Sequence, residues 1–146
     1  MSRLLGRGGG LLIGIDLQKD VSVIEAAYND GEGVTAAFNL NMLARINREL
    51  DGNFNLNRFE HQANYNDIEH RIEITIQSLQ EQTVQVGDHA IEFAAGEEIL
   101  TEYSHKYTIE GFAEFAETYG FSLHHHWTDS QNYFGVLHLV VEGATS

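Results

Sequence analysis

The middle of the chain alternates apolar and polar side chains, a pattern typical of antiparallel strands with one buried face. The clearest run is residues 71–77, RIEITIQ, where isoleucine occupies every second position. Residues 59–65 alternate in the same way, and two short runs, 83–86 and 89–93, flank a Gly-Asp turn. We therefore expect a small antiparallel sheet or partial barrel over roughly residues 55–106.

Apolar residues three or four positions apart predict helices on both sides of this block. Asp20 is placed to cap a helix over residues 21–28, and a longer helix is expected over about 34–50. Thr108 is placed to cap a third helix, which Gly120 ends. The apolar face of this third helix consists of Phe112, Phe115, Ala116 and Tyr119.

Further strands are expected near the two ends of the chain. Residues 11–17, LLIGIDL, form a continuous apolar run, which predicts a strand covered on both faces. Residues 121–128 and 133–141 predict a hairpin. The glycines within residues 1–10 indicate the tail of a helix followed by a turn, although a flexible N-terminus fits the same pattern. The predicted fold class is α+β, with helices packed on a mixed sheet and an inserted antiparallel β block.

Composition narrows the function more than the fold. The chain has 146 residues and a net charge of −14, which argues against binding nucleic acid or anionic lipid. It has no cysteine, so a disulfide, a thiolate nucleophile and a cysteine-based zinc site are excluded. The longest apolar run is too short to span a membrane, and glycines interrupt the run that a signal peptide would need. We therefore expect a cytoplasmic protein.

The candidate chemistry lies in residues 96–107, GEEILTEYSHKY. On a strand, alternation places the side chains of Glu102 and Ser104 on the same face, about 6 to 7 Å apart. One imidazole ring has nitrogens on two edges, so it could donate to Glu102 and exchange a hydrogen bond with Ser104. A solvated glutamate and serine on an ordinary half-exposed strand fit the spacing as well.

The longer segment 93–107, FAAGEEILTEYSHKY, resembles the substrate strand of the histidine-specific, S-adenosylmethionine-dependent N-methyltransferases, which make trimethylhistidine for ergothioneine. Other segments resemble the same family in the same order, namely 11–20, 26–43, 47–63 and 125–140. The resemblance covers nearly the whole chain but only the C-terminal part of the family. The glycine-rich cofactor loop of the family's N-terminal part has no counterpart in this sequence.

The resemblance implies a division of the chain into two parts. Residues 1–30 and 107–146 would form the C-terminal part of a Rossmann-like methyltransferase sheet, with strands over 11–17, 121–128 and 133–141. Residues 31–106 would form an inserted substrate-binding lobe. The cofactor of the complete enzyme would be S-adenosylmethionine, and we expect this chain not to bind it tightly.

The resemblance also assigns substrate-binding residues. Glu102 and Ser104 match the pair that grips the substrate imidazole, which favours histidine over an indole substrate. Tyr28 matches a tyrosine at the amino-acid end of the substrate, although a half-buried tyrosine ending a helix fits too. Thr35 lies in the matching segment and equally suits a helix cap. We expect no catalytic side chain, because transfer of a methyl group to the histidine α-amine needs positioning and not a protein nucleophile.

The run from His124 to His126 raises the question of a metal. Only His124 and His126 share a face of a strand, with His138 on the partner strand within reach of one of them. No second cluster with zinc-ligand spacing is present, so we expect no metal site. Polar histidines on a half-exposed strand, or His126 with Trp127 packed on the core, fit the sequence better. An acidic protein that binds metal through this run is the least favoured function.

Two functional hypotheses follow. The first is the substrate-recognising C-terminal part of an S-adenosylmethionine-dependent histidine N-methyltransferase, inactive alone, with histidine or methylated histidine as its ligand. The alternative is a stand-alone binding or assembly module. It would form a homodimer or pair with a separate N-terminal methyltransferase chain through the open edge of strand 11–17.

Overall fold

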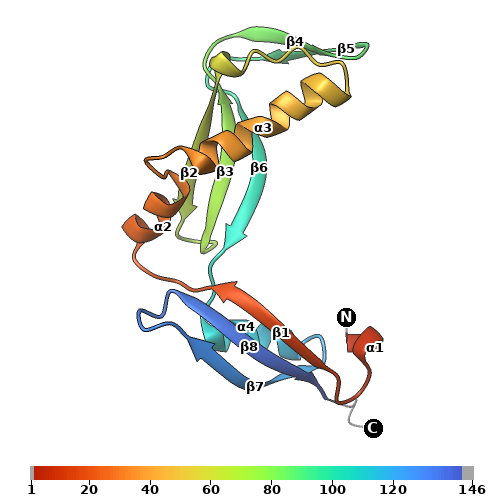
Figure 1. Ribbon diagram of the computed structural model, residues 1–146, viewed down its shortest axis with the longest axis vertical. Coiled ribbons are helices and arrows are strands. Elements are labelled where there is room, and N and C mark those ends of the chain that lie inside the picture. The colour runs from red at the N-terminus through yellow and green to blue at the C-terminus, as the bar shows by residue number, and fades with distance from the viewer. Residues whose placement is uncertain (1, 143–146) are drawn as a thin grey trace. The chain divides into compact units, whose positions relative to one another are not determined.

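The computed structural model describes residues 2–142, which divide into two compact units (Figure 1). The first unit combines Met1–Lys19 with His105–Ser146, and the second is the continuous segment Asp20–Ser104. The helix expected over 21–28 therefore belongs to the second unit, whereas the sequence boundaries grouped it with the chain ends.

The first unit is built on a three-stranded sheet in which the last strand lies in the middle. The strand order is β1 (Gly10–Asp16), β8 (Phe134–Val141) and β7 (Phe121–Thr128), and both pairs are antiparallel. The unit also contains α1 (Ser2–Leu5) and α4 (Ile109–Glu117). The predicted terminal hairpin is confirmed, and so is the helix tail with its glycine turn, since Gly6 has φ +69°.

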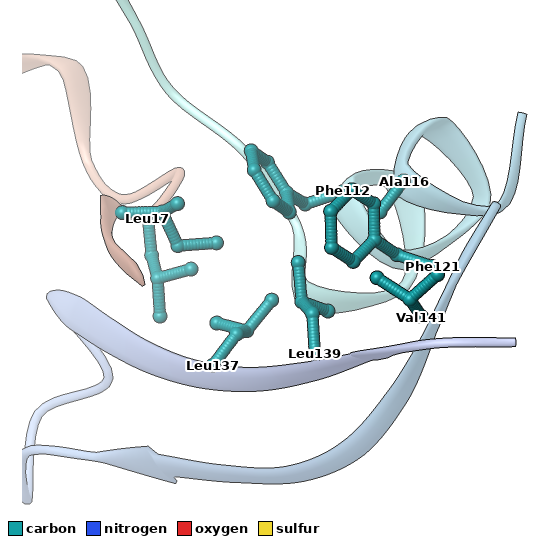
Figure 2. Packing of buried hydrophobic residues seen from close by; sticks show 8 residues of the cluster. Leu17, Phe112, Ala116, Phe121, Leu137, Leu139 and Val141 are labelled. Atoms are coloured by element: carbon teal, nitrogen blue, oxygen red, sulfur yellow. The ribbon is translucent and has the colours of Figure 1, made fainter. Parts of the chain in front are cut away.

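One face of this sheet carries the core of the first unit. Figure 2 shows side chains of β8 and α4 in contact there, together with Leu17 after β1. The buried members are Ile15, Leu17, Phe112, Ala116, Phe121, Leu137, Leu139 and Val141. The expectation that strand 11–17 is covered on both faces is wrong. Ile15 is 4% exposed, but Leu12 on the opposite face is 66% exposed, because α4 covers only one side.

A buried lysine ties the end of β1 to the segment before α4. The ammonium of Lys106 lies 2.9 Å from a carboxylate oxygen of Asp16, and its side chain is fully buried. Lys19 lies 2.5 Å from the other oxygen of Asp16 and donates to the backbone carbonyl of Tyr133. Burial of Asp16 raises the pKa of its carboxyl, but the hydrogen bonds from the two lysines outweigh this, so the pKa is lowered.

The second unit contains the antiparallel block that the sequence predicted. β3 (Arg71–Ser78) lies between β2 (Phe59–Asn66) and β6 (Glu98–His105), and β2 pairs antiparallel with β3. A separate hairpin joins β4 (Gln82–Val86) to β5 (His89–Phe93). The alternation in 71–77 is confirmed, because its three isoleucines are all buried.

Two helices cover one face of this sheet. α2 (Val21–Tyr28) leads through a short loop to α3 (Val34–Glu49), which crosses the sheet in Figure 1, and the 3-10 helix η1 (Leu56–Arg58) precedes β2. One core cluster includes Leu43 of α3 and consists of Leu43, Phe54, Phe59, Ile76, Val84 and Phe93. A second cluster includes Ile24 of α2 and consists of Ile24, Ala63, Ile72 and Ile74, with Tyr28 and Tyr65 packed against it.

The helix starts follow the polar residues before them. Asp20 accepts from Ser22 N and Thr108 accepts from Gly111 N, as the sequence predicted. At α3 the cap is Asp30, whose carboxylate accepts from the backbone N–H groups of Val34 and Thr35. These backbone hydrogen bonds lower the pKa of Asp30. Within residues 2–142, the structure contains no helix that is both long and apolar enough to cross a bilayer.

Candidate functional site

The candidate site is a pocket of about 330 Å³ in the second unit, between α3 and the adjoining strands. Its helical side consists of Thr35, Phe38, Asn39, Asn41, Met42 and Arg45. The remaining lining residues are Tyr28 from α2, Ile74 from β3, and Thr101 and Glu102 from β6. Three of the four residues singled out by the sequence therefore line one concave surface.

The fourth residue, Ser104, contacts this surface through Tyr28. The Tyr28 hydroxyl lies 2.6 Å from Ser104 Oγ, and either oxygen can donate the hydrogen bond. Tyr28 is the last residue of α2 and Ser104 lies near the end of β6, so the contact joins elements that are far apart in the sequence. Both hydroxyls are half-buried. The pair places a polar group beside the pocket at the end where α2 meets the sheet.

Glu102 presents an exposed carboxylate to the same pocket. Its neighbour Thr101 also lines the pocket and donates from its hydroxyl to the backbone oxygen of Ile74 at 2.9 Å. Thr101 and Glu102 are consecutive residues of the edge strand β6, and both line the pocket. Tyr103 takes a different position, with the guanidinium of Arg71 3.7 Å from its ring centroid.

Thr35 lines the pocket as the second residue of α3, so its side chain does not cap the helix. The capping alternative for Thr35 is wrong, because Asp30 supplies the oxygens that accept from the first turn. The cap fixes where α3 begins, and hence which of its residues line the pocket, among them Thr35, Phe38 and Asn39. The sequence signal for this cap was present, since Asp30 precedes two glycines and the apolar stripe of α3.

A hydrogen-bonded pair of side chains, Asn39 and His61, lies beside the pocket and is not predicted by the sequence pattern. The side-chain amide of Asn39 lies 3.0 Å from His61 Nδ1, and His61 Nε2 lies 3.1 Å from the backbone oxygen of Tyr28. Asn39 also donates to the backbone oxygen of Thr75 at 3.0 Å. The alternation of residues 59–65 predicted which residues of β2 face inward, but only the fold brings His61 to the end of α2.

The histidines of the first unit make pairwise ring contacts. The rings of His124 and His138 lie 5.9 Å apart between centroids, which confirms that the two strands bring them together. His125 contacts Trp127, whose side chain is 51% exposed, so packing of Trp127 on the core is wrong. Across residues 2–142, the structure has no group of three histidine, aspartate or glutamate side chains that could hold a metal ion.

The described residues do not fit S-adenosylmethionine. Nucleotide-type cofactors bind at the carboxyl ends of strands, on glycine-rich turns that lead into helices. In residues 2–142 the strand-to-helix connections are 17–20 and 106–108, and neither contains a glycine. The glycine-rich segment 6–10 precedes β1 and does not follow a strand.

Comparisons with known proteins identify histidine methyltransferases as relatives of this chain. The sequence profile of the family described as histidine-specific methyltransferase, SAM-dependent, matches residues 1–141. A histidine N-alpha-methyltransferase of Mycolicibacterium smegmatis is 48% identical over 132 residues, which cover 88% of this chain and 41% of the relative. The corresponding protein of Mycobacterium tuberculosis is 42% identical over 131 residues, with the same coverage.

More distant matches extend to other substrates and to a solved structure. An L-tryptophan methyltransferase of Psilocybe serbica is 27% identical, over 91% of this chain and 38% of that protein. A crystal structure of an S-adenosylmethionine-dependent methyltransferase from Clostridium acetobutylicum has a TM-score of 0.44 and 12% identity. It covers 97% of this chain and 48% of that one, and a likeness this distant supports no conclusion. The chain spans about two fifths of the length of the curated relatives it matches.

Proposed function

The chain belongs to the family of histidine-specific, S-adenosylmethionine-dependent methyltransferases, and from this premise we propose that it supplies the histidine-recognising part of such an enzyme. The reaction would be methyl transfer to the α-amine of histidine, as the names of two relatives suggest. The observation that carries the proposal is the contact between Tyr28 and Ser104 beside the pocket that Glu102 lines.

The proposed binding mode uses the two nitrogens of the imidazole. The carboxylate of Glu102 would accept a charge-assisted hydrogen bond from one ring N–H, and the hydroxyl of Ser104 would bond the other nitrogen. Tyr28 would contact the amino-acid end of the substrate, with Thr35 beside it. An indole has a single ring nitrogen, so it would leave one of the two polar groups without a partner. This favours histidine over tryptophan.

In this proposal the chain binds and orients the substrate. Productive transfer requires the uncharged α-amine to be held in line with the methyl group, so positioning is the main contribution of the protein. S-adenosylmethionine supplies the methyl group in the complete enzyme. Because the described residues do not fit this cofactor, we propose that the 146-residue chain alone binds it poorly and has no methyltransferase activity.

Histidine binding tests the proposed pocket directly. Titration of the isotope-labelled chain with histidine, followed by NMR, should give a dissociation constant of about a millimolar, because only part of the site is present. Glu102→Gln should weaken binding about tenfold by removing the charged acceptor. Glu98→Gln, on the same strand, is the matched control and should leave binding unchanged. Equal affinities for histidine in the Glu102→Gln variant and the unaltered chain would refute this binding mode.

Activity is tested separately from binding. The isolated chain is incubated with histidine and S-adenosylmethionine carrying a labelled methyl group, and the amino acids are then analysed for label. We expect no labelled histidine. Turnover by the 146-residue chain would contradict the proposed inactivity.

A second candidate function rests on β1. Its pairing with β8 leaves the other edge without a neighbouring strand among the described residues, apart from a parallel bridge between Leu17, just after β1, and Tyr107. Leu12 on this strand is 66% exposed. Unpaired strand edges accept further strands. We propose that this edge pairs with a polypeptide that carries the cofactor-binding part of the family fold.

The association is tested by light scattering and by mixing with such a polypeptide. The unaltered chain should bind it, and Leu12→Lys, which places a charge beside the edge, should abolish binding. Glu98→Lys, in the second unit, is a control for the added charge. A homodimer of the chain alone, or the absence of any complex, would contradict this choice of partner.

A further inference from the structure

The side chain of Asn39 fixes the hydrogen-bonding role of His61. Asn39 is 8% exposed, and its Nδ2 atom lies 3.0 Å from both the backbone oxygen of Thr75 and His61 Nδ1. A carbonyl oxygen only accepts, so the amide nitrogen of Asn39, and not its oxygen, must face Thr75. The same nitrogen then donates its second hydrogen to His61. His61 Nδ1 must therefore be the acceptor.

The contact of the other ring nitrogen, Nε2, independently indicates the same tautomer of His61. His61 Nε2 lies 3.1 Å from the backbone oxygen of Tyr28, which can only accept, so Nε2 carries the hydrogen. Both neighbours thus require the neutral tautomer protonated at Nε2. A second proton at Nδ1 would face the amide hydrogens of Asn39. Rotating the amide would instead bring its oxygen against the oxygen of Thr75.

His61 acts on the end of α2, which carries the tyrosine of the proposed site. The last carbonyls of a helix have no partner within the helix, and His61 donates to that of Tyr28, the final residue of α2. The next residue, Asn29, donates from its side chain to the backbone oxygen of Ala63 on β2 at 2.9 Å. These bonds hold the helix end on β2, and from there the Tyr28 hydroxyl contacts Ser104.

We propose that His61 is a positioning residue whose neutral imidazole holds Tyr28 against Ser104 and so keeps the pocket in its binding geometry. The proposal rests on the proposed function, because it extends the histidine pocket by one residue that does not line it. His61 does not contact the substrate in this view. It acts through the backbone of Tyr28, and Asn39 sets its tautomer.

The first test needs no ligand. Imidazole ¹⁵N spectra of the 146-residue chain should show His61 protonated at Nε2 and unprotonated at Nδ1. His61→Gln can still donate to Tyr28 O and accept from Asn39, so the ring signals of Tyr28 should stay in place. His61→Leu can do neither, so the Tyr28 signals should shift. Protonation at Nδ1, or unmoved Tyr28 signals in His61→Leu, would overturn the proposal.

The second test connects the positioning to binding. The dissociation constant for histidine should rise about tenfold in His61→Leu and stay within about threefold in His61→Gln. His89→Leu, on the exposed hairpin strand β5, is the control and should bind as the unaltered chain does. Rescue by glutamine separates positioning from a general loss of packing, and thermal unfolding of each variant verifies that it folds.

The outcomes distinguish failure of the positioning role of His61 from failure of the proposed histidine-binding function. If the unaltered chain binds no histidine, the proposed function fails, while the tautomer and the Tyr28 signals still decide the role of His61. If histidine binds with equal affinity to the unaltered chain and to His61→Leu, the pocket stands and the positioning role of His61 is refuted.

Discussion

Lys106 shows how burial and charge act together at a single residue. Its side chain is fully buried, and the carboxylate of Asp16 2.9 Å away offsets the loss of water around its charge. Asp16 is only partly buried and keeps a second partner in Lys19. The two members of the pair are therefore not equivalent. The buried ammonium of Lys106 has no contact with water, whereas the carboxylate of Asp16 is partly exposed to it.

This asymmetry predicts an order of mutational effects. Asp16→Asn removes the carboxylate beside a buried ammonium and should lower the free energy of unfolding by about 2 kcal/mol, less than for a fully buried pair. Lys106→Met replaces the buried charge with an apolar chain of similar length and should cost less than about 1 kcal/mol. Urea unfolding of both variants measures the order, and a larger loss for Lys106→Met would contradict it.

The lowered pKa of Asp16 has a consequence in acid. A folded-state pKa below the unfolded value of 3.8 stabilises the protein above that pH, and this stabilisation is lost as the pH falls through the folded value. The difference in unfolding free energy between the unaltered chain and Asp16→Asn should therefore shrink below about pH 4. Urea unfolding at a series of pH values from 3 to about 7 measures it. A difference that is constant with pH would argue against the ion pair.

A substitution at Thr75 is expected to raise the free energy of unfolding. Its side chain is 7% exposed, and its hydroxyl is the buried side-chain group without a hydrogen-bond partner among the described residues. Thr75→Val keeps the shape and removes the unsatisfied hydroxyl, so the free energy of unfolding should rise by about 1 kcal/mol. Thermal unfolding measures the change. A loss of stability would indicate that the hydroxyl has a partner, such as a bound water.

At the scale of single residues, the sequence allows candidate residues to be named but does not predict their contacts with residues far along the chain. The acid and hydroxyl of β6 could be found from alternation and resemblance, because both signals are local. The burial of Lys106 could not, because it depends on Asp16, which is distant in the sequence. The contacts of His61 could not be predicted for the same reason, since its partners come from α2 and α3.

At the scale of elements, the sequence predicted nearly every helix and strand, because periodicity and caps are local. The exception is the environment of β1. Its apolar run is typical of a strand with two covered faces, but a second cover must come from other residues, and among residues 2–142 only α4 packs on it. Phe115 and Tyr119, which belong to the predicted apolar face of α4, are 53% and 61% exposed.

The turn after α3 provides a test of local structure. The Asn47 side chain donates to the backbone oxygen of Phe54 and accepts from its backbone N–H, at 2.8 and 2.7 Å. A Cβ on Gly52 would lie 2.9 to 3.2 Å from Asn47, so the turn is tight. Asn47→Ala should lower the unfolding free energy by about 2 kcal/mol. Asn41→Ala, on an exposed turn of the same helix, is the control, and equal losses would contradict the role of Asn47.

At the scale of the whole molecule, the chain forms two compact units with separate cores. Units with their own cores can open separately. In Asn47→Ala, hydrogen exchange should therefore accelerate within Asp20–Ser104 while β1, β7 and β8 keep their protection. Exchange that accelerates equally in both units would show that they unfold as one.

The central place of β8 in its sheet also sets an order of events during synthesis. β8 follows every other described strand, so β1 leaves the ribosome long before its hydrogen-bonding partner exists. At about 5 to 20 residues per second, this delay lasts roughly 6 to 24 seconds. The continuous segment Asp20–Ser104 can fold in that interval. Until β8 is made, the leucines and isoleucines of β1 remain exposed and can associate with other polypeptides. We therefore expect a chaperone to bind this strand during synthesis.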